Sequence, residues 1–400
     1  MRFLWALHSP QKFCMIALIK ALWKEEAYME TRKDDNAGRS NPERIFELLR
    51  TEEALTKQEI MAKLGLSMPT TLQNVNGMLA AGFLEECGET ASTGGRRAKK
   101  LRLNREAAYG VGMNIALRQV ELVVTDLMGE PLFSHTVPLV FRDVPECYEQ
   151  IGRELNGFLD RSGVNAERIL GVGIAFPGII NAQAGIIVRS HIFKLEYVSL
   201  DRFKKNILFP VIVENEANCA CFAERSAARG TYLYLSLNES VGGAVMMDKQ
   251  LLRGNSFQTG EFGHMLLIPG GKMCYCGKAG CADAYLSPRV LTSGDESLDG
   301  FFGRLHAGDQ QAEGVWDTYL EHLAILCTNL RMAFNLDLVI GGEVGGRLAP
   351  FIPALCRKAA QYDRFARDVE YLFPCARTHN AFATGAAMLA VEQFSSRLLI

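Results

Sequence analysis

The stretch that most constrains this 400-residue chain runs from Glu261 to Asp283 and reads EFGHMLLIPGGKMCYCGKAGCAD. It holds one histidine and three cysteines in the spacing H-x9-C-x-C-x4-C, namely His264, Cys274, Cys276 and Cys281. Three thiolates and one imidazole are the ligand set of a closed, four-coordinate structural zinc site, which has no open position for catalysis. A cluster of free thiols or a disulfide is the alternative. Because four soft ligands lie so close together in the sequence, we predict a structural Zn2+ ion.

The composition is that of a globular protein of two or three domains, with 48% hydrophobic and 22% charged residues. A formal net charge of −2 argues against a chain that is basic throughout, so any contact with nucleic acid must be local. Eleven cysteines in a chain of this length, three of them in a metal-binding pattern, favour a reducing cytoplasm over disulfide bonds. We therefore expect a cytoplasmic protein.

The N-terminal stretch of residues 3–23 is apolar but is interrupted by polar residues and a proline. It lacks a signal-peptide cleavage site and an unbroken apolar run of ~20 residues, so no membrane segment is expected. Residues 1–40 are predicted to be a disordered or misannotated extension.

Residues 41–104 have the pattern of a winged helix-turn-helix DNA-binding domain. Asn41 and Pro42 are expected to open the first helix as its N-cap and first helical residue. Thr56 and Glu59 form a capping box for the second helix, and a glycine turn follows.

The next helix carries polar side chains near its N-terminus, as a recognition helix does. Ser67 is its expected N-cap, and Leu72, Val75 and Leu79 are its expected buried stripe. A glycine hairpin with a basic cluster follows over residues 92–102 and suits a wing that contacts phosphates or a minor groove. The residues predicted to contact DNA are Ser67, Thr70, Thr71, Gln73, Asn74, Arg96, Arg97 and Lys99. A small helical dimerisation module with a solvated basic loop is the alternative.

The motif E-x-G-H followed by C-x-C-G-x-x-G-C-x-acid resembles the signature of the ROK family, which contains sugar kinases and sugar-responsive repressors. The resemblance extends from about Asn41 to the C-terminus. It implies an α/β fold in which the winged helix-turn-helix precedes a two-lobed, actin-like and hexokinase-like (ribonuclease H-like) body. The first lobe would comprise residues 108–211 plus 381–400, and the second lobe, with the zinc knuckle, residues 212–380.

The first phosphate loop of ROK kinases, D-x-G-G-T, is degenerate in this chain. Asn114 stands at the position of the acid, Ala116 and Leu117 replace the glycines, and Arg118 replaces the threonine. The glycines let backbone N–H groups approach a phosphate, and the acid positions magnesium or the transferred phosphoryl group. Their joint replacement predicts that the chain is not an enzyme. A sugar kinase with an N-terminal extension is the alternative.

By the same resemblance the sugar-binding residues are Asn215, Glu216, Glu261, His264 and Asp283. Glu216 stands in place of the aspartate that is the catalytic base of the kinases, and Asp283 in place of a glutamate. We interpret these changes as a paired swap that keeps two carboxylates but reshapes one pocket. His264 could bind the metal through one ring nitrogen and donate its other N–H to a sugar hydroxyl. A pocket that binds nothing is one alternative.

The sequence thus predicts a transcriptional regulator, a repressor of sugar uptake or catabolism genes, that binds operator DNA and senses a sugar or sugar derivative between its lobes. A repressor that responds to a partner protein in place of a sugar is a further alternative. We expect a homodimer or homotetramer, because paired recognition helices must match half-sites about one helical turn (~34 Å) or a multiple of it apart.

Overall fold

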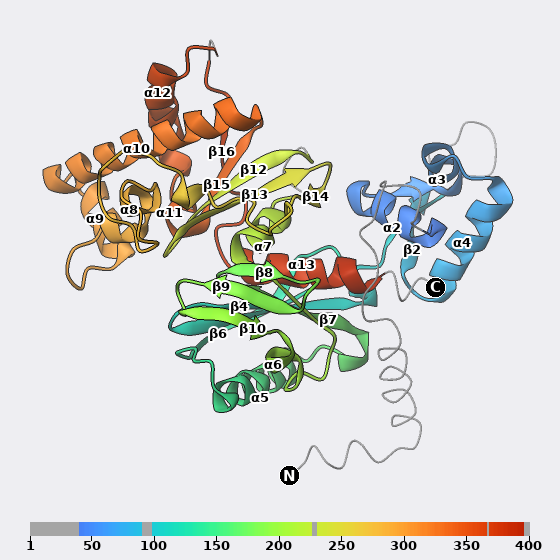
Figure 1. The fold of residues 1–400 in the computed structure, drawn as a ribbon. Helices are drawn as coiled ribbons and strands as arrows, with labels where there is room; N and C mark the ends of the chain where they lie inside the picture. The colour runs from blue at the N-terminus through green and yellow to red at the C-terminus, as the bar shows by residue number, and fades with distance from the viewer. Residues whose placement is uncertain (1–39, 90–97, 226–229, 366–367, 396–400) are drawn as a thin grey trace.

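The computed structural model of the chain describes residues 40–89, 98–225, 230–365 and 368–395. The predicted extension, apart from Ser40, and the wing residues Arg96 and Arg97 lie outside the described residues. Figure 1 shows a small N-terminal module beside two larger α/β lobes. Among the described residues, no helix combines the length and apolar character needed to cross a membrane.

The N-terminal module consists of three helices and a small antiparallel sheet with the strand order β1-β3-β2. Its elements are α2 (Asn41–Thr51), β1 (Leu55–Thr56), α3 (Lys57–Leu64), α4 (Met68–Ala80), β2 (Leu84–Glu89) and β3 (Lys99–Leu103).

The caps of these helices follow the sequence signals, with one difference. Ser40, and not Asn41, is the N-cap of α2, because the Ser40 side chain accepts the Glu43 N–H and the Glu43 carboxylate accepts the Ser40 N–H. The predicted Thr56–Glu59 capping box of α3 is confirmed, as is the Ser67 cap of α4.

The buried stripe of α4 is displaced from the predicted one. Thr71, Val75 and Met78 are buried, whereas Leu72 is 38% exposed. The Thr71 hydroxyl donates a hydrogen bond to the Ser67 carbonyl at 3.0 Å, which satisfies its polar group and lets the side chain enter the core. The predicted exposure of Thr71 to DNA is therefore wrong, and Leu72 lies on the exposed face.

The first lobe is built on a five-stranded sheet of order β11-β7-β4-β5-β6. Its strands are β4 (Tyr109–Ile115), β5 (Gln119–Thr125), β6 (Pro131–Pro138), β7 (Ile169–Phe176) and β11 (Val211–Asn215). One face is covered by α5 (Pro145–Ser162) and the other by α13 (Ala381–Ser395) (Figure 1). A three-stranded antiparallel sheet and a short helix are appended, comprising β8 (Ile179–Asn181), β9 (Ile186–Ser190), β10 (Leu195–Ser199) and α6 (Asp201–Lys204). Because β11 pairs with β7 along its whole length, the first-lobe sheet extends to Asn215 and not only to the expected residue 211.

The second lobe contains a five-stranded sheet of order β14-β13-β12-β15-β16. Its strands are β12 (Tyr232–Leu237), β13 (Val241–Met247), β14 (Gln250–Leu251), β15 (Leu338–Gly341) and β16 (Leu372–Pro374), and its helices are α8 (Asp283–Leu286), α9 (Leu298–His306), α10 (Gln310–Phe334), α11 (Gly342–Gly345) and α12 (Ile352–Tyr362). Gly242 and Gly243 lie within β13. The lobe is therefore organised around a mixed sheet with the long helix α10 beside it.

Two helices, α7 (Glu216–Ala223) and α13, pack against each other where the lobes meet. A Cβ atom on Gly385 of α13 would lie only 1.7 Å from the Cys219 carbonyl oxygen of α7. On the opposite side, a Cβ atom on Gly112 of β4 would lie 1.7 Å from the Ala383 carbonyl oxygen of α13. Only glycine allows such close backbone approaches, so α13 is held between α7 and the first sheet.

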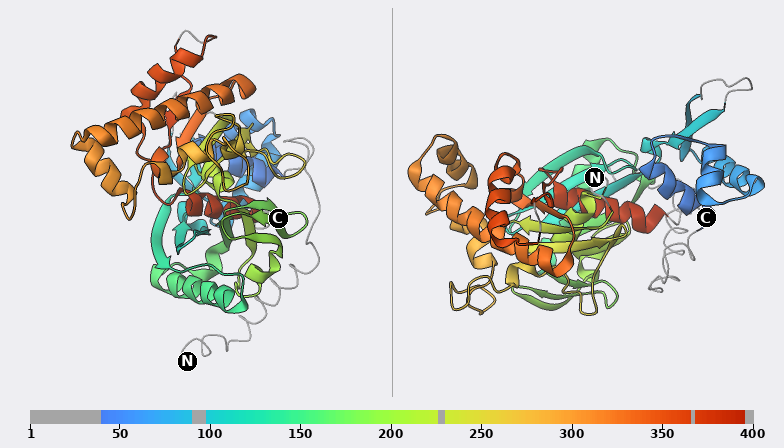
Figure 2. Two further views of the ribbon diagram at one scale, coloured as in Figure 1. Left: turned by 60° about the vertical axis from the view of Figure 1, so that its left-hand side comes forward. Right: turned by 90° about the horizontal axis from the view of Figure 1, so that it is seen from above.

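The C-terminal half of α13 also reaches the N-terminal module, as Figure 2 shows from two further directions. Ala390, Val391 and Phe394 share one hydrophobic cluster with Ile45 and Leu49 of α2. The module is therefore packed onto the body and not merely tethered to it.

Candidate metal centre and interlobe pocket

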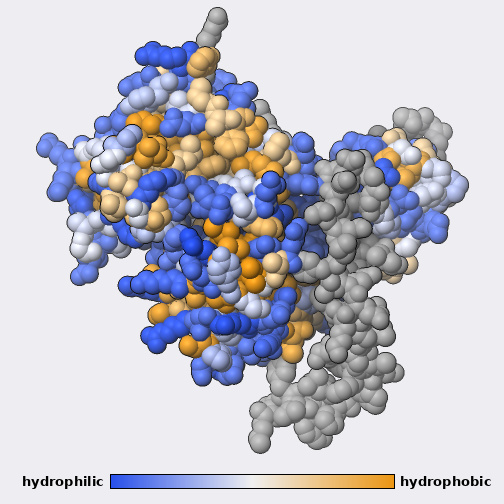
Figure 3. Space-filling view, viewed as in Figure 1, coloured by the Kyte–Doolittle hydropathy of each residue, from blue (hydrophilic) through white to orange (hydrophobic). Residues whose placement is uncertain are grey.

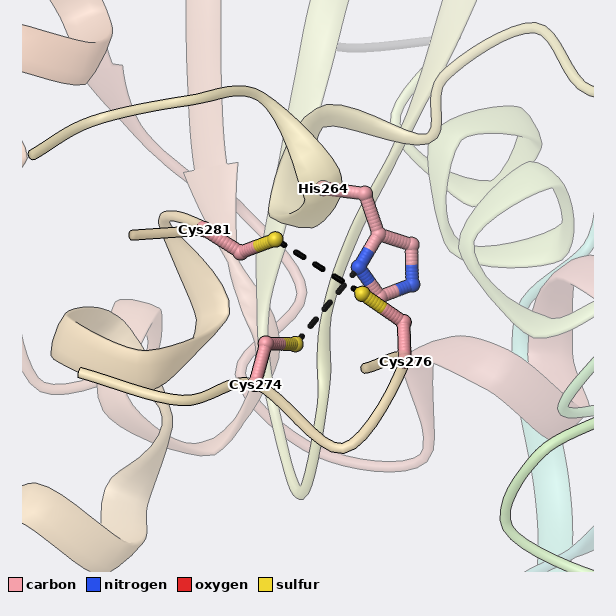
Figure 4. Close-up of side chains that lie close together, drawn as sticks. All are labelled: His264, Cys274, Cys276 and Cys281. Carbon is pink, nitrogen blue, oxygen red and sulfur yellow. Dashed lines mark hydrogen bonds between the residues drawn. The ribbon is translucent and has the colours of Figure 1, made fainter. Parts of the chain in front are cut away.

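The four predicted metal ligands lie together in the second lobe (Figure 4). The Sγ atoms of Cys276 and Cys281 are 3.7 Å apart, and the Cys274 Sγ lies 3.8 Å from the His264 Nδ1. A tetrahedral ion with metal–ligand bonds of about 2.0–2.3 Å separates its ligands by roughly 3.5–3.8 Å, whereas a disulfide would hold two sulfurs ~2.05 Å apart. One ligand atom from each residue lies within 4.8 Å of every other. The four side chains therefore fit one metal ion and do not form a disulfide.

Backbone contacts alone hold the shape of the loop that carries the four predicted metal ligands. The N–H groups of Leu267 and Ile268 both donate to the Gly280 carbonyl, and Leu266 forms a β-bridge with Cys281. Gly280 has a φ of 90°, and a Cβ atom there would lie 1.9 Å from the Ile268 carbonyl oxygen. A glycine is thus required beside the third cysteine of the motif.

A pocket lies between the lobes beside this cluster and is lined by polar side chains from both of them. The lining residues that bear on its chemistry are Arg189, His191, Asn215, Glu216, Ser240, Glu261, His264 and Tyr275. In Figure 3 hydrophilic residues cover most of the visible face of both lobes, with hydrophobic patches among them.

Asn215 lies at the pocket but uses its side chain mainly to hold the local fold. Its Oδ1 accepts the N–H groups of Ala217 and Asn218 at the start of α7, at 2.8 and 3.2 Å. Its Nδ2 donates to the Gly178 carbonyl at 2.9 Å, which joins α7 to the loop after β7. Asn215 therefore fixes the direction in which Glu216 enters the pocket.

Glu216 is the first residue of α7 and one of two carboxylates that line the pocket. Burial raises its pKa to about 8, and the neighbouring carboxylates of Glu239, Glu121 and Glu343 add to this shift. Glu261 is the second, and the surrounding protein raises its pKa even though 43% of its side chain is exposed. Its Oε2 lies 3.9 Å from the His264 Nε2. The pocket thus holds acceptors that are costly to ionise unless a ligand donates hydrogen bonds to them.

Asp283 does not line the pocket, in contrast to the prediction. Its side chain is 3% exposed, and its Oδ2 accepts the Val241 N–H at 2.7 Å. The carboxylate therefore holds the start of β13 behind the pocket wall. Of the two acids predicted to line one pocket, Glu216 and Asp283, only Glu216 does so.

The hairpin between β4 and β5, where the sequence predicted a degenerate phosphate loop, is closed by its own hydrogen bonds. The Ala116 N–H donates to the Gln119 carbonyl at 3.0 Å, and the Asn114 Nδ2 donates to the Glu121 Oε2 at 3.1 Å. Asn114 is 3% exposed, and burial raises the pKa of Glu121. The Ala116 N–H and the Asn114 Nδ2 therefore already have acceptors within the protein.

On the N-terminal module, the predicted DNA-contact residues differ in their availability. Gln73 is exposed on α4, whereas Asn74 is half-buried and donates through Nδ2 to the Thr70 carbonyl at 2.7 Å. The Ser67 and Thr70 hydroxyls lie 2.7 Å apart at the start of α4. Lys99, on β3, forms an ion pair with Glu86 across the hairpin.

Four of the pocket residues named above were not predicted from the sequence, namely Arg189, His191, Ser240 and Tyr275. Arg189 and His191 come from the β9–β10 region of the first lobe, well before Glu261 and His264 in the sequence. Tyr275 stands between two of the metal ligands, and its place in C-x-C was the one signal that could have drawn attention to it.

The described chain thus combines a helix-turn-helix module packed on two α/β lobes with a cluster of four potential metal ligands beside an interlobe pocket. A solved ROK-family transcriptional regulator, described as a homolog of the E. coli MLC protein, has this fold with a TM-score of 0.75. The alignment covers 90% of this chain and 98% of that chain at 17% identity.

The chain belongs to the ROK family, whose sequence model matches residues 111–393. It is similar to the xylose repressor of Bacillus spizizenii, with 26% identity over 356 residues, covering 85% of this chain and 92% of that protein. It is also similar to the glucokinase of Halalkalibacterium halodurans, with 30% identity over 204 residues, covering 44% of this chain and 62% of that enzyme.

Proposed function

We propose that this protein is a transcriptional repressor that binds operator DNA through its N-terminal module and senses a sugar in the interlobe pocket. The observation that carries the proposal is the extent of the two similarities. The xylose repressor aligns over 85% of this chain, whereas the glucokinase aligns over 44%. A protein that shares nearly its whole length with a repressor is best explained as a regulator.

The proposal includes a structural zinc ion held by His264, Cys274, Cys276 and Cys281. Zinc favours tetrahedral sites of sulfur and nitrogen ligands, which is the set present here. The ion would brace the wall that carries His264 and supply no reaction step. None of the ten cysteines within the described residues forms a disulfide, which supports a cytoplasmic location.

The proposal also excludes sugar kinase activity. A phosphate loop needs free backbone N–H groups and an acid that can position a metal. Here the Ala116 N–H is used in a turn, and Asn114 stands where the acid would be. Glu121, Glu239 and Glu343 lie close enough to Glu216 to raise its pKa, and such a group of carboxylates would repel a nucleotide phosphate.

In this proposal α7 and α13 carry the signal from the pocket to the DNA-binding module. The N-terminus of α7 bears Glu216, and at its other end Arg225 forms an ion pair with Glu392 of α13. Glu392 lies 3.6 Å from Arg50 of α2, so one carboxylate joins the body to the module. A sugar that favours one arrangement of the lobes would thereby change the position of α4 in the dimer or tetramer we propose.

The test combines DNA binding with a kinase assay on the full chain. Duplexes selected by the protein from a random pool serve as the operator, and release is followed by fluorescence anisotropy during titration with D-xylose, D-glucose or N-acetylglucosamine. We expect one of these sugars to weaken DNA binding, with no phosphosugar formed from Mg-ATP. Selection of no duplex, together with ATP-dependent sugar phosphorylation, would favour the kinase. Selection of a duplex that no sugar releases would favour a regulator with a protein effector.

A further inference from the structure

Tyr275 lies at the point where the metal centre, the pocket and the first lobe meet. It stands between Cys274 and Cys276, and its side chain lines the pocket with 44% of its surface exposed. Its ring centroid is 5.3 Å from that of His264 and 5.5 Å from that of His191. Since His191 belongs to the first lobe, Tyr275 makes a ring contact across the interlobe cleft.

The hydroxyl of Tyr275 faces the nitrogen of His264 that points away from the metal ligands. The His264 Nδ1 faces Cys274 at 3.8 Å, so the ring's proton belongs on Nε2 when a metal is bound. Two acceptors lie near this N–H, the Tyr275 hydroxyl at 3.3 Å and the Glu261 Oε2 at 3.9 Å. Both distances exceed the usual 2.9–3.0 Å of such hydrogen bonds. The Nε2–H is therefore only weakly satisfied.

We propose that Tyr275 is an internal competitor that occupies the ligand-facing nitrogen of His264 until a hydroxyl of the bound molecule displaces it. This inference rests on the proposed sugar-sensing function and adds the residue that controls access to the pocket. A hydroxyl of the ligand can accept from the His264 Nε2–H and donate to the Glu261 carboxylate, which a tyrosine hydroxyl at these distances does poorly. The ligand class that fits is an uncharged polyhydroxy compound, because a phosphate placed beside Glu261 would be repelled.

Displacement of Tyr275 has a second consequence, because the same ring contacts His191. A ligand that moves the Tyr275 hydroxyl away from His264 also disturbs the ring contact between the lobes. Tyr275 thus links the selection of the ligand to the movement of the two lobes.

The substitution Tyr275→Phe removes the competing hydroxyl and keeps the ring contact with His191. Isothermal titration of the full, metal-loaded chain with D-xylose, D-glucose and N-acetylglucosamine should show about two- to tenfold tighter binding of the sugar that binds the wild type, the range for loss of one competing hydrogen bond. The matched control Tyr197→Phe removes an exposed tyrosine hydroxyl that does not line the pocket, so its sugar affinity should stay close to that of the wild type. Weaker or unchanged binding by the Tyr275→Phe variant would overturn the proposal.

A readout without sugar separates this inference from the proposed function. The 15N chemical shift of the His264 Nε2 should move in the Tyr275→Phe variant, with the metal content unchanged, because its hydrogen-bond partner is lost. An unmoved shift would overturn the contact itself. If the shift moves but no sugar binds to the wild type, the contact stands and both the sugar-sensing function and the displacement that rests on it fail.

Discussion

The two ends of α7 differ in how their charged groups are satisfied. At the pocket end, Glu216 lies near three other carboxylates, and its pKa is raised to about 8. At the far end, both oxygens of Glu224 accept backbone N–H groups, those of Ala376 and Arg377, at 2.8 Å. The next residue, Arg225, is 6% exposed at its side chain and pairs with Glu392.

This difference indicates which end of α7 can respond to a ligand and which end is fixed by existing contacts. A hydrogen bond donated by a ligand stabilises a carboxylate that has no partner of its own. A group whose partners are already in place is not stabilised further. A ligand therefore acts at the N-terminus of α7, and the other end passes any displacement on to α13. Four experiments would break or sharpen this comparison.

The largest effect is expected from Cys281→Ser, which removes a proposed metal ligand that is fully buried. Loss of a structural metal is among the few single changes that cost more than about 4 kcal/mol of the free energy of unfolding. Metal analysis should show less than one bound ion per chain, and thermal melting should occur at a lower temperature. The control Cys356→Ser changes a half-buried thiol outside the cluster and should keep both values near those of the wild type. Equal melting temperatures for the two variants would contradict a structural metal site.

The second effect concerns the satisfied end of α7. Glu392→Gln leaves the buried Arg225 guanidinium without its counter-charge, which we expect to cost about 3 kcal/mol. If the far end transmits the signal, the variant should still bind DNA and sugar separately, but sugar should release DNA less than in the wild type. Anisotropy titrations with and without sugar measure the ratio of the two DNA affinities. The control Glu47→Gln removes a surface partner of Arg50 on α2 and should leave the ratio unchanged. A Glu392→Gln variant with a wild-type ratio would show that the signal takes another path.

The third effect is a pH dependence at the pocket end. The pKa of Glu216 rises from 4.5 to about 8 on folding, so its contribution to stability is complete below pH 4.5 and is lost as the pH rises to 8. Over this window the loss should be about 2 kcal/mol, smaller than the full shift implies because Glu216 is only half-buried and water screens its charge. Denaturant melts of the wild type should show this decline, and those of Glu216→Gln should show less of it. Parallel pH profiles of the two proteins would mean that Glu216 ionises normally.

The smallest effect is expected outside α7, on α4, the proposed recognition helix. Gln73→Ala should weaken binding to the selected operator by about 1 kcal/mol with no change in melting temperature, because the side chain is exposed. Thr71→Ser is the matched change on the buried face and should alter stability but not DNA affinity. Both are measured by anisotropy at one fixed salt concentration, since DNA affinity depends on salt. The opposite pattern would restore the orientation of α4 that the sequence predicted.

The sequence predicted best what is encoded by neighbouring residues. The four metal ligands lie in one short segment, and the Thr56–Glu59 and Ser67 caps depend on side chains three residues apart. The buried face of α4 was predicted wrongly because Thr71 was assumed to face solvent. Its hydroxyl instead donates a hydrogen bond to the Ser67 carbonyl, so the side chain can be buried. The contact of His191 with Tyr275 and the turn of Asp283 toward Val241 depend on distant segments, which a periodic pattern does not record.

The glycine contacts of α13 have a consequence for how the protein forms during synthesis. This helix leaves the ribosome after both sheets have been made, yet Gly112 and Gly385 show that it fits against the first sheet and α7 at backbone distance. Until it arrives, one face of the first sheet and part of the hydrophobic surface of α2 have no cover. The nascent chain would therefore carry an N-terminal module that acquires its final attachment only after both lobe sheets have been synthesised, when a chaperone that shields apolar surface would be most useful.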